Sequence, residues 1–348
     1  MKIVVTGGLG YIGSHTCINL LNKDHDIIII DNCVNSKKDT LNKLFKITGK
    51  KINYIDIDLR DRPSVLELAE LKLFNGVDGI IHFAALKKVG ESNTMPFEYY
   101  QNNLFSLLNI IELCKKLNCY NFIYSSSATV YPESSTHPFL ETQATANNHR
   151  YPYMVTGPSP YGTTKIVGEQ ILQDISAADE KWNIVLLRYF NPVGNHSSGL
   201  IGDDIFVKNP FFNLFTAIMN KKCQGLPLTI FGNDYSTPDG TCIRDYVHVL
   251  DVADAHVRTL EWGSSKKGLH CFNIGMGKGI SVKEVVDKFN EKGFNLKYEY
   301  VSRRMGDIPS MCADTKHTED IIGWTAKYDL NRMVEDTIRY YNAQTKNR

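Results

Sequence analysis

The fold of this chain is decided by its first residues, Lys2–Ile3–Val4–Val5–Thr6–Gly7–Gly8–Leu9–Gly10–Tyr11–Ile12–Gly13. The run Ile3–Val5 is apolar and β-branched, which predicts a short buried strand. The glycines fit G-x-G-x-x-G from Gly8 and a wider G-x-x-G-x-x-G from Gly7. Glycine suits a backbone that turns sharply and approaches a pyrophosphate without a Cβ in the way. The helix predicted over Ser14–Lys23 would point its N-terminal N–H groups at that phosphate.

A second predicted strand, Ile27–Ile30, ends at Asp31, whose carboxylate would accept hydrogen bonds from an adenosine ribose. Strand, glycine turn, helix, strand and acid in this order are typical of a dinucleotide-binding unit, and an ordinary glycine turn is the weaker interpretation. A carboxylate would repel a 2′-phosphate, so the sequence favours NAD over NADP. The residues that follow Asp31 are neutral, which agrees with NAD: Asn32, Asn35 and Ser36. Lys37 and Lys38 lie further along the chain and leave NADP as an alternative.

Bulk composition excludes several classes of function. The net charge of +1, with 22% charged residues, gives no electrostatic case for a nucleic acid or a membrane surface as partner. No apolar run approaches the length that spans a bilayer, and the N-terminus runs directly into a strand, so we expect a cytoplasmic location. Eight cysteines without a C-x-x-C motif are expected to be reduced thiols, and ten histidines without a clustered ligand set predict no metal site.

Strand and helix patterns alternate through the first half of the chain, which predicts an α/β fold with a doubly wound, Rossmann-type parallel sheet. Further strands are predicted over Ile52–Ile57, Gly79–Ala85, Asn121–Ser125 and Ile184–Phe190. Helices are predicted from Ser36, with Asp39 completing a capping box, from Asp61 with Pro63 in the first turn, over Pro96–Leu117, and over Tyr161–Ile175. A loop is expected from Pro132 to Pro160.

The pattern changes after Asn191, where loops lengthen and strands become short. We therefore expect a dinucleotide-binding domain over residues 1–190 and a smaller α+β substrate domain over 191–348, with segments such as 251–275 returning to the first. Within the second, Ser281 and Glu284 predict a capping box, and Leu330–Tyr341 predicts a terminal amphipathic helix.

Tyr161 and Lys165 are spaced i, i+4, which places both side chains on one helical face. Of the 18 tyrosines only this one has a lysine four residues later, although chance alone supplies about one such pair in a chain of this size. The position of the pair carries more weight than its spacing. It opens the helix after the fifth strand, so both side chains should project near the carboxyl ends of the strands, where doubly wound sheets bind ligands.

These residue types suit proton transfer. A phenol with a pKa of about 10 is a poor base at neutral pH, but an ammonium group at ~4 Å, at an effective dielectric constant of about 20, contributes roughly 4 kcal/mol, or about three pKa units. Ser127, at the tip of the fifth strand, is the natural third member, because its hydroxyl could hydrogen-bond the reacting oxygen. A solvated helix pair and an ordinary turn serine are the plainer interpretations. The dinucleotide signature favours the catalytic one.

The chain resembles the extended short-chain dehydrogenases/reductases and, within them, the UDP-glucose 4-epimerases. Blocks that carry the resemblance spread over nearly the whole chain, and several are specific to the epimerases: Val5–Thr16, His82–Lys87, Val89–Ser92, Ser125–Tyr131, Ser159–Gly162, Leu187–Gly194, Phe231–Tyr235 and Arg244–Val249. The resemblance implies interconversion of UDP-galactose and UDP-glucose through a 4-keto sugar, with NAD permanently bound. Tyr161 would be the base, Ser127 would orient the sugar hydroxyl, and Lys165 would lower the phenol pKa and contact the nicotinamide ribose.

The resemblance also assigns binding residues. Contacts to NAD are implied for Gly7, Gly10, Tyr11, Ile12, Gly13, Asp31, Asn32, Asn35, Ser36, Asp58, Leu59, Phe83, Ala84, Ala85, Lys87, Asn102, Ser127, Tyr161, Lys165 and Phe190. Contacts to the UDP-sugar are implied for Ser127, Tyr161, Asn191, Asn213, Leu214, Thr229, Ile230, Phe231, Arg244, Tyr246, Arg304, Asp307 and Met311. A homodimer through the helices Pro96–Leu117 and Tyr161–Ile175 is implied as well, although their outer apolar residues fit a core equally.

Departures from the family pattern bear on the reaction and the substrate. Ala128–Thr129–Val130 lacks the carboxylates that sugar-nucleotide dehydratases carry there, which disfavours elimination and also the related uronate decarboxylases. Where the family commonly has Pro-Asn-Asn-Leu, this chain has Pro210–Phe211–Phe212–Asn213–Leu214, so that of the two asparagines only Asn213 is carried over, and Pro132 replaces a glycine. Met311 stands where the family commonly has Tyr or Cys, so UDP-GlcNAc and UDP-GalNAc are alternative substrates, as is a UDP-uronic acid. A nucleotide sensor without catalysis is the alternative from another functional class.

Overall fold

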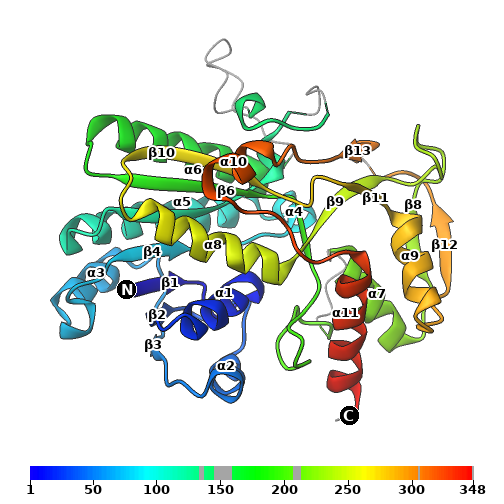
Figure 1. Ribbon diagram of the computed structural model, residues 1–348, viewed down its shortest axis with the longest axis horizontal. Coiled ribbons are helices and arrows are strands. Elements are labelled where there is room, and N and C mark those ends of the chain that lie inside the picture. Colours follow the sequence, from blue (N-terminus) through cyan, green and yellow to red (C-terminus); the bar gives the residue numbers. More distant parts are fainter. Residues whose placement is uncertain (133–136, 145–158, 207–212, 305, 347–348) are drawn as a thin grey trace. The chain divides into compact units, whose positions relative to one another are not determined.

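The computed structural model describes residues 1–348 except 133–136, 145–158, 207–212, 305 and 347–348 (Figure 1). Most of the loop predicted from Pro132 to Pro160 therefore lies outside the described residues, as do the residues at 210–212 that depart from the family pattern. Among the helices in the described part, none is both long and apolar enough to cross a membrane.

The central sheet has seven strands in the order β10-β6-β5-β4-β1-β2-β3. Their bounds are β1 Lys2–Thr6, β2 Asp26–Ile30, β3 Asn53–Ile55, β4 Gly79–His82, β5 Asn121–Ser127, β6 Asn183–Tyr189 and β10 Gly268–Ile274. The strands β3, β2, β1, β4 and β5 pair in parallel, with Ile3 between Ile27 and Gly79. The strand order reverses between β1 and β4, and ligands bind beyond the carboxyl ends of strands at such a switch point. The predicted doubly wound sheet is confirmed.

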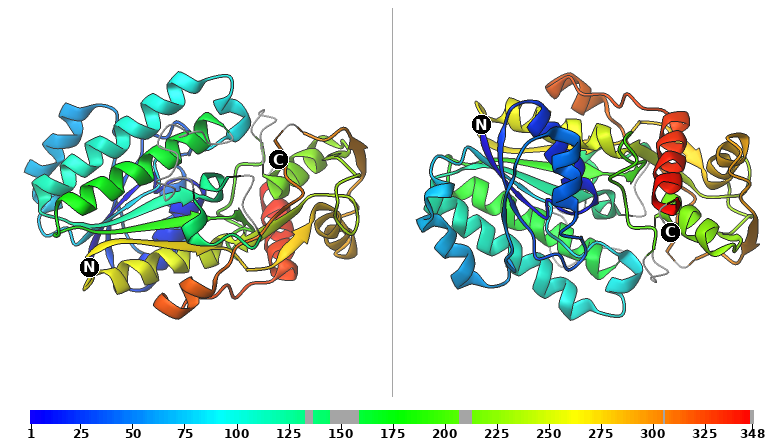
Figure 2. Two further views of the ribbon diagram at one scale, coloured as in Figure 1. Left: turned by 90° about the horizontal axis from the view of Figure 1, so that it is seen from above. Right: turned by 90° about the horizontal axis from the view of Figure 1, so that it is seen from below.

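Helices cover both faces of this sheet (Figure 2). Their bounds are α1 Tyr11–Asn22, α2 Thr40–Thr48, α3 Arg62–Glu67, α4 Val89–Ser92, α5 Pro96–Leu117, α6 Pro160–Ala178 and α8 Val249–Gly263, with short 3-10 turns η1 Leu68–Glu70, η2 Lys72–Phe74, η3 Ala128–Val130 and η4 Glu141–Gln143. One face of the strands packs with α3, α5 and α6 into a core that contains Val4, Ile80 and Leu107. Because both faces of the sheet are covered, these strands are continuous hydrophobic runs in the sequence.

Two predicted helix starts are wrong. The helix predicted from Ser14 begins three residues earlier, at Tyr11, with Gly10 as its N-cap residue. The sequence predicted a helix from Ser36, but α2 begins at Thr40, and the Asp39 side chain does not cap it. The Ser36 hydroxyl instead donates to Asp31 Oδ1 at 2.9 Å. The local pattern is ambiguous, because Ser36 fits two structures. It could begin a capping box with Asp39, and it could also lie in a turn where its hydroxyl donates to a nearby carboxylate, here that of Asp31.

The chain separates into two compact units. The first contains Met1–Pro132, Thr142–Arg188 and Ala253–Phe272, and the second contains Glu133–Glu141, Tyr189–Val252 and Asn273–Arg348. In the second unit β9 pairs with three strands, antiparallel to β11 and parallel to β7 and β13, while β8 pairs with β12. The bounds are β7 Asn191–Val193, β8 Leu228–Phe231, β9 Ile243–His248, β11 Gly279–Ser281, β12 Tyr298–Val301, β13 Ser310–Met311, α7 Leu214–Gln224, α9 Val282–Glu291, α10 Lys316–Ile322 and α11 Leu330–Thr345.

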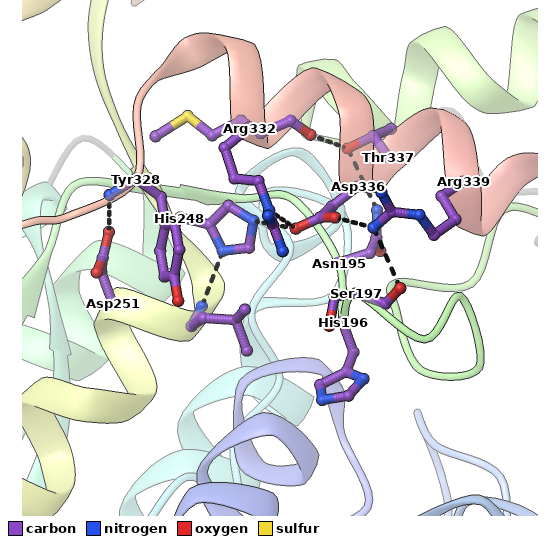
Figure 3. A network of polar contacts seen from close by, with 12 residues as sticks. Asn195, His196, Ser197, His248, Asp251, Tyr328, Arg332, Asp336, Thr337 and Arg339 are labelled. Atoms are coloured by element: carbon purple, nitrogen blue, oxygen red, sulfur yellow. Dashed lines mark hydrogen bonds and ion pairs between the residues drawn. The ribbon is translucent and has the colours of Figure 1, made fainter. Parts of the chain in front are cut away.

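Buried polar contacts fix the terminal helix α11 in the second unit (Figure 3). The Asp336 carboxylate is fully buried and accepts from Arg332 Nε at 2.6 Å, while His248 Nε2 lies 3.4 Å away. Burial raises the Asp336 pKa, but the hydrogen bonds of His248 and Arg332 outweigh burial and leave the pKa below its usual range. These contacts join the amino-terminal half of α11 to His248 at the end of β9.

The capping box at α9 is confirmed and yields a stability prediction. Ser281 Oγ accepts from Glu284 N at 3.0 Å, and Glu284 Oε2 accepts from Ser281 N at 2.7 Å. We expect Ser281→Ala to lower the free energy of unfolding by about 1–2 kcal/mol, because the buried cap oxygen is lost. Thr315→Ala is the matched control, since Thr315 precedes α10 without a side-chain cap bond, and it should change stability by less than about 0.5 kcal/mol. Urea unfolding curves that fail to separate the two variants would contradict this assignment.

Candidate functional site

The glycine turn between β1 and α1 forms a cradle that no side chain would fit. Gly7 has a φ of +67°, its N–H donates to Ile30 O at 2.8 Å, and its carbonyl accepts from Gly10 N at 3.1 Å. A Cβ on Gly7 would lie 2.8 Å from Ala84 N, and a Cβ on Gly13 would lie 2.3 Å from Gly7 O. Together with the following α1 N-terminus at Tyr11 and Ile12, this backbone suits a pyrophosphate.

The carboxylate of Asp31 is fixed at the tip of β2. Its Oδ2 accepts from Leu9 N at 3.0 Å, and its Oδ1 accepts from Cys33 N and from Ser36 Oγ, both at 2.9 Å. The acid is thereby tied to the glycine turn, as a dinucleotide ribose would require. Among the neighbouring predicted residues, Asn35 is exposed and Asn32 is partly buried.

The tips of β3 and β4 place further predicted residues at the same edge of the sheet. Asp58 pairs with Arg60 at 2.6 Å, and hydrogen bonds from Arg60 hold the Asp58 pKa below its usual range. The next residue, Leu59, is buried and its carbonyl accepts from Asn109 Nδ2 at 2.8 Å. Phe83, Ala84 and Ala85 follow β4 directly, with Ala84 N donating to Thr6 Oγ1 at 3.3 Å.

Asn103 is a connecting residue that the sequence did not indicate. Its side chain accepts from Leu86 N at 2.8 Å and donates to Leu86 O and Thr164 Oγ1, each at 3.0 Å, so it joins the loop after β4 to α5 and α6. The predicted Asn102 lies beside it and donates to Asn103 Oδ1 at 3.0 Å. The predicted Lys87 lies in that loop, with Nζ 5.3 Å from the centroid of the Tyr11 ring.

Tyr161 and Ser127 are brought together. Ser159 caps α6 by accepting from Gly162 N at 3.1 Å, and the proline at N1 of the helix leaves Tyr161 in its first turn. The Ser127 hydroxyl oxygen accepts from Thr129 N at 3.2 Å, which leaves its proton to donate elsewhere, and the nearby hydroxyl acts to lower the Tyr161 pKa. Tyr161 as a whole residue is buried, with 9% of its surface exposed.

Lys165 lies one helical turn further along α6, buried under the tyrosine. Its Nζ donates to Ser125 O at 2.5 Å and lies 4.7 Å from the centroid of the Tyr124 ring and 5.9 Å from that of Tyr161. The predicted triad of Ser127, Tyr161 and Lys165 therefore gathers at the carboxyl end of β5.

The predicted fall in the Tyr161 pKa is wrong for this structure. Burial raises the pKa of Tyr161 to about 12, even though the Ser127 hydrogen bond lowers it. Burial likewise lowers the pKa of Lys165 to about 7, against the opposing charge of Glu169. By the pH at which the phenol ionises, the lysine has already lost its proton and has no charge with which to assist. The prediction assumed a permanently charged lysine, and burial removes that condition.

In the second unit two arginines converge on one carboxylate. Arg304 donates to Asp307 at 3.1 Å from Nε and at 2.8 Å from Nη2, and Arg244 Nη2 lies 3.4 Å from the same side chain. Arg244 Nη1 also donates to Ile308 O at 2.8 Å, and the Arg304 guanidinium lies 5.6 Å from the Phe231 ring centroid. The cluster offers guanidinium forks that suit diphosphate oxygens.

The other residues predicted for the substrate are distributed over several elements. Strand β8 contains Thr229, Ile230 and Phe231, of which Phe231 is exposed. In the register of β9, Asn191 pairs with Tyr246 and Met311 pairs with Arg244. Asn213 caps α7, which begins at Leu214, and Phe190 N donates to Ile274 O at 3.0 Å. Tyr246 lies in the core, 3% exposed, with its ring centroid 5.8 Å from that of Phe215.

The sequence did not indicate the buried carboxylates Asp245 and Glu169. Asp245 accepts from Met276 N at 2.6 Å, Gly277 N at 3.0 Å and Ala313 N at 3.1 Å, and burial raises its pKa to about 6 despite these bonds. Glu169 forms a bidentate ion pair with Arg188. The spacing of Tyr161, Lys165 and Glu169 at four-residue intervals was the signal available for the second. Within the described residues no three His, Cys, Asp or Glu side chains are grouped to hold a metal ion.

Comparison with known proteins identifies close relatives. Residues 3–275 match the family model described as the NAD dependent epimerase/dehydratase family. The chain is 41% identical to the UDP-glucose 4-epimerase of Bacillus subtilis, over 99% of this chain and 97% of that one. Similar solved structures are the UDP-glucose-4-epimerase of Stenotrophomonas maltophila with bound NAD and formylated UDP-arabinopyranose (TM-score 0.92, 36% identity, 100% of both chains) and that of Bifidobacterium longum with NAD+ and UDP (TM-score 0.88, 40% identity, 100% of this chain and 99% of that one).

Proposed function

The chain belongs to the NAD dependent epimerase/dehydratase family, and from this we propose that it interconverts UDP-galactose and UDP-glucose by inverting C4 of the hexose. The observation that carries the proposal is the grouping of Tyr161, Ser127 and Lys165 at the carboxyl edge of the sheet that also presents the glycine cradle: Lys165 Nζ lies 5.9 Å from the Tyr161 ring centroid, and Ser127 lowers the Tyr161 pKa. The full-length similarity to UDP-glucose 4-epimerases supports this choice among the reactions of the family.

NAD fits the residues of the first unit. The turn from Gly7 to Gly13 would hold the pyrophosphate, because the space beside it admits backbone and no side chain, and Asp31 would accept from the adenosine ribose. When bound, NAD⁺ accepts a hydride from C4 of the sugar and later returns it. Because the reaction has no net redox change, the same cofactor serves every cycle.

Tyr161 is the proposed base. Its phenolate would take the proton of the sugar 4-hydroxyl as C4 becomes a ketone, and would give the proton back once the sugar presents its other face. Ser127 would orient the same hydroxyl, and the bond that its oxygen accepts from Thr129 N supports this role because it leaves the Ser127 proton to donate. Lys165 would carry the positive charge that stabilises the phenolate, which requires the lysine to be protonated while Tyr161 is not.

The UDP group is the proposed anchor of the substrate. A sugar that must turn over in the site cannot be gripped firmly, so binding energy has to come from the part that does not react. Arg244 and Arg304 would bind the diphosphate, with Asp307 holding their side chains in position, and β8 around Phe231 would contact the uracil. Asn191, Asn213 and Leu214 remain proposed contacts. The buried position of Tyr246 suits support of β9 better than direct contact.

A second candidate substrate class is favoured by Met311. This partly buried side chain pairs in register with Arg244 on β9, and methionine is flexible and smaller than tyrosine. UDP-GlcNAc and UDP-GalNAc are therefore alternative substrates, and a UDP-uronic acid is a less supported one.

Purified protein, assayed without added cofactor, tests the activity and its range. We expect turnover of UDP-galactose, and turnover of UDP-GlcNAc at a comparable rate if Met311 leaves room for the acetamido group. If UDP-galactose reacts and UDP-GlcNAc does not, the N-acetylated sugars are excluded as substrates. Turnover of UDP-glucuronate alone would replace the proposed substrate.

A homodimer through α5 and α6 completes the proposal and gives a prediction. Phe97, Phe105 and Leu108 on α5 are 70%, 51% and 46% exposed, at spacings that place them on one side of the helix. We expect Phe105→Glu to convert a dimer into a monomer in sedimentation velocity, because a buried charge at an interface is costly. Phe45→Glu on α2, 49% exposed, is the matched control and should leave the dimer intact. A wild-type monomer would contradict this part of the proposal.

We also propose a cytoplasmic location for the protein. All eight cysteines lie in the described part of the chain, and no disulfide joins any of them. Several are buried with raised thiol pKa values, as at Cys17 and Cys119. Reduced, unreactive thiols of this kind are usual in cytosolic proteins.

A further inference from the structure

The end of β5 and one stripe of α6 are joined by three successive serines. Each contacts one of three α6 residues spaced four apart: Ser127 with Tyr161, Ser125 with Lys165, and Ser126 with Glu169. Residues four apart lie one above the other on a helix, so Glu169 is the next side chain beyond Lys165 on the face that carries the tyrosine. The proposed mechanism uses the first two members of this stripe and leaves the third without a role.

Glu169 is held as a fixed negative charge. Arg188 on β6 donates to its Oε1 at 2.9 Å from Nε and to its Oε2 at 2.6 Å from Nη2, while Ser126 Oγ donates to Oε1 at 2.5 Å. Both ionic side chains are 1% exposed. A bidentate pair with a third donor satisfies the carboxylate and fixes its orientation. Tyr131 and Cys271 face the Arg188 side chain as well, and its pKa stays well above the usual range.

In the part of the chain that the structure describes, Glu169 supplies the negative charge near Lys165. Among the described residues, the titratable groups that face the lysine are Tyr161 and Glu169 on α6, Tyr124 on β5 and His82 on β4. Burial and the lysine charge lower the pKa of His82 to about 3, so His82 is neutral and adds no charge of its own. Tyrosine side chains are neutral at physiological pH. Glu169 therefore opposes the cost of burying an ammonium group at this position.

The number of protons that Tyr161 and Lys165 share shows why the charge of Glu169 is relevant to the reaction. Burial sets the pKa of Lys165 at about 7 and that of Tyr161 at about 12, so between these values the two side chains together hold one proton, and burial favours the tyrosine as its holder. The proposed reaction needs the other arrangement, a phenolate beside an ammonium group. A negative charge next to the lysine favours that arrangement without changing the total number of protons.

We propose that Glu169, clamped by Arg188 and Ser126, is a positioning residue whose charge increases the share of the protein in which Lys165 holds the shared proton and Tyr161 is free to act as the base. This inference rests on the proposed function, in which Tyr161 accepts the proton of the sugar hydroxyl. A merely structural Glu169 would tie α6 to β6 and would leave the protonation of Lys165 unchanged.

Direct titration of Lys165 distinguishes the two roles. The full-length protein is labelled with ¹³C at the lysine Cε, the Lys165 signal is assigned with Lys165→Arg, and its chemical shift is followed with pH. We expect a midpoint near pH 7 in the wild type and a midpoint lower by about one pH unit or more in Glu169→Gln. Ser126→Ala is the matched control, because it removes a hydrogen bond to Glu169 but leaves the charge, and its midpoint should stay close to that of the wild type.

Activity provides the second measurement. A shift of one unit corresponds to a tenfold smaller share of the active proton arrangement, so kcat of Glu169→Gln should fall about tenfold with little change in KM. Because Glu169→Gln leaves Arg188 buried without its partner, which is costly for folding, Glu169→Gln/Arg188→Met removes both charges and should show the same direction of shift. An unchanged Lys165 midpoint in either folded variant overturns the inference. A wild-type protein that fails to turn over UDP-galactose refutes the proposed function instead, while the titration still decides the role of Glu169.

Discussion

Tyr161→Phe should lower kcat for UDP-galactose by about 10²- to 10⁴-fold, because the substitution removes the only atom proposed to carry the proton of the sugar hydroxyl. Phenylalanine fills the same space, and Tyr161 sits in a helix whose cap at Ser159 does not involve the phenol oxygen. Stability and bound NAD should therefore be nearly unchanged. The rate is measured by following UDP-glucose formation, and the cofactor is released with acid and quantified.

The matched control for this variant is Tyr120→Phe. Tyr120 precedes β5 at the opposite end from Ser127, and its ring packs edge-on against Trp182. Loss of its hydroxyl should leave kcat within about twofold of the wild type, since it lies away from the site. A Tyr161→Phe enzyme with a rate close to that of Tyr120→Phe would remove the tyrosine from the mechanism. A protein that binds NAD but turns over no UDP-sugar, in the wild type as in the variant, would favour the nucleotide sensor.

Gly13→Ala should remove bound NAD and destabilise the first unit by about 3 kcal/mol. The added Cβ would lie 2.3 Å from Gly7 O and 2.9 Å from Gly8 Cα, and both are backbone atoms that cannot move without opening the turn. The expected result is a protein purified with little cofactor and a lower midpoint of thermal unfolding. Calorimetry and cofactor content measure the two effects.

Gly49→Ala is the control for Gly13→Ala, because it introduces backbone strain without a steric clash of the added Cβ. Gly49 has a φ of +69°, so alanine is strained there, but no described atom beyond its chain neighbours lies within 4 Å of where its Cβ would be. The expected cost is about 1 kcal/mol with full cofactor content. If Gly13→Ala were as mild as Gly49→Ala and kept its NAD, the tight turn would not be the site of the pyrophosphate.

The fold was predictable from the sequence where the signals are local. Ile3–Val5 and Ile27–Ile30 are short apolar runs separated by a glycine turn and a helix, and this arrangement specifies a parallel pair without knowledge of the rest of the chain. The predicted helix over Pro96–Leu117 has the bounds that the structure shows, since a proline begins it and Asn118 in the left-handed conformation ends it. The i, i+4 spacing likewise placed Tyr161 and Lys165 on one face of α6.

Features that depend on distant segments were not predictable. The pairing of Glu169 with Arg188 joins α6 to β6, and Asp245 collects N–H groups from Met276 and Ala313, which are 31 and 68 positions away. The pKa values of Tyr161 and Lys165 depend on burial by the surrounding elements, which no spacing in the sequence reports. The interaction of Ser36 with Asp31 shows the same limit at short range, because two local patterns compete for one serine.

The central claim is that the hydrogen at C4 leaves the sugar and returns to the same carbon within one enzyme cycle, while Tyr161 moves only the hydroxyl proton. The measurement that tests it most directly uses UDP-galactose deuterated at C4, incubated in ordinary water with the purified protein and no added cofactor. We predict UDP-glucose with deuterium retained at C4, because hydride from carbon does not exchange with solvent protons. UDP-glucose that has lost the deuterium to water, or deuterium found at another carbon, would contradict the account.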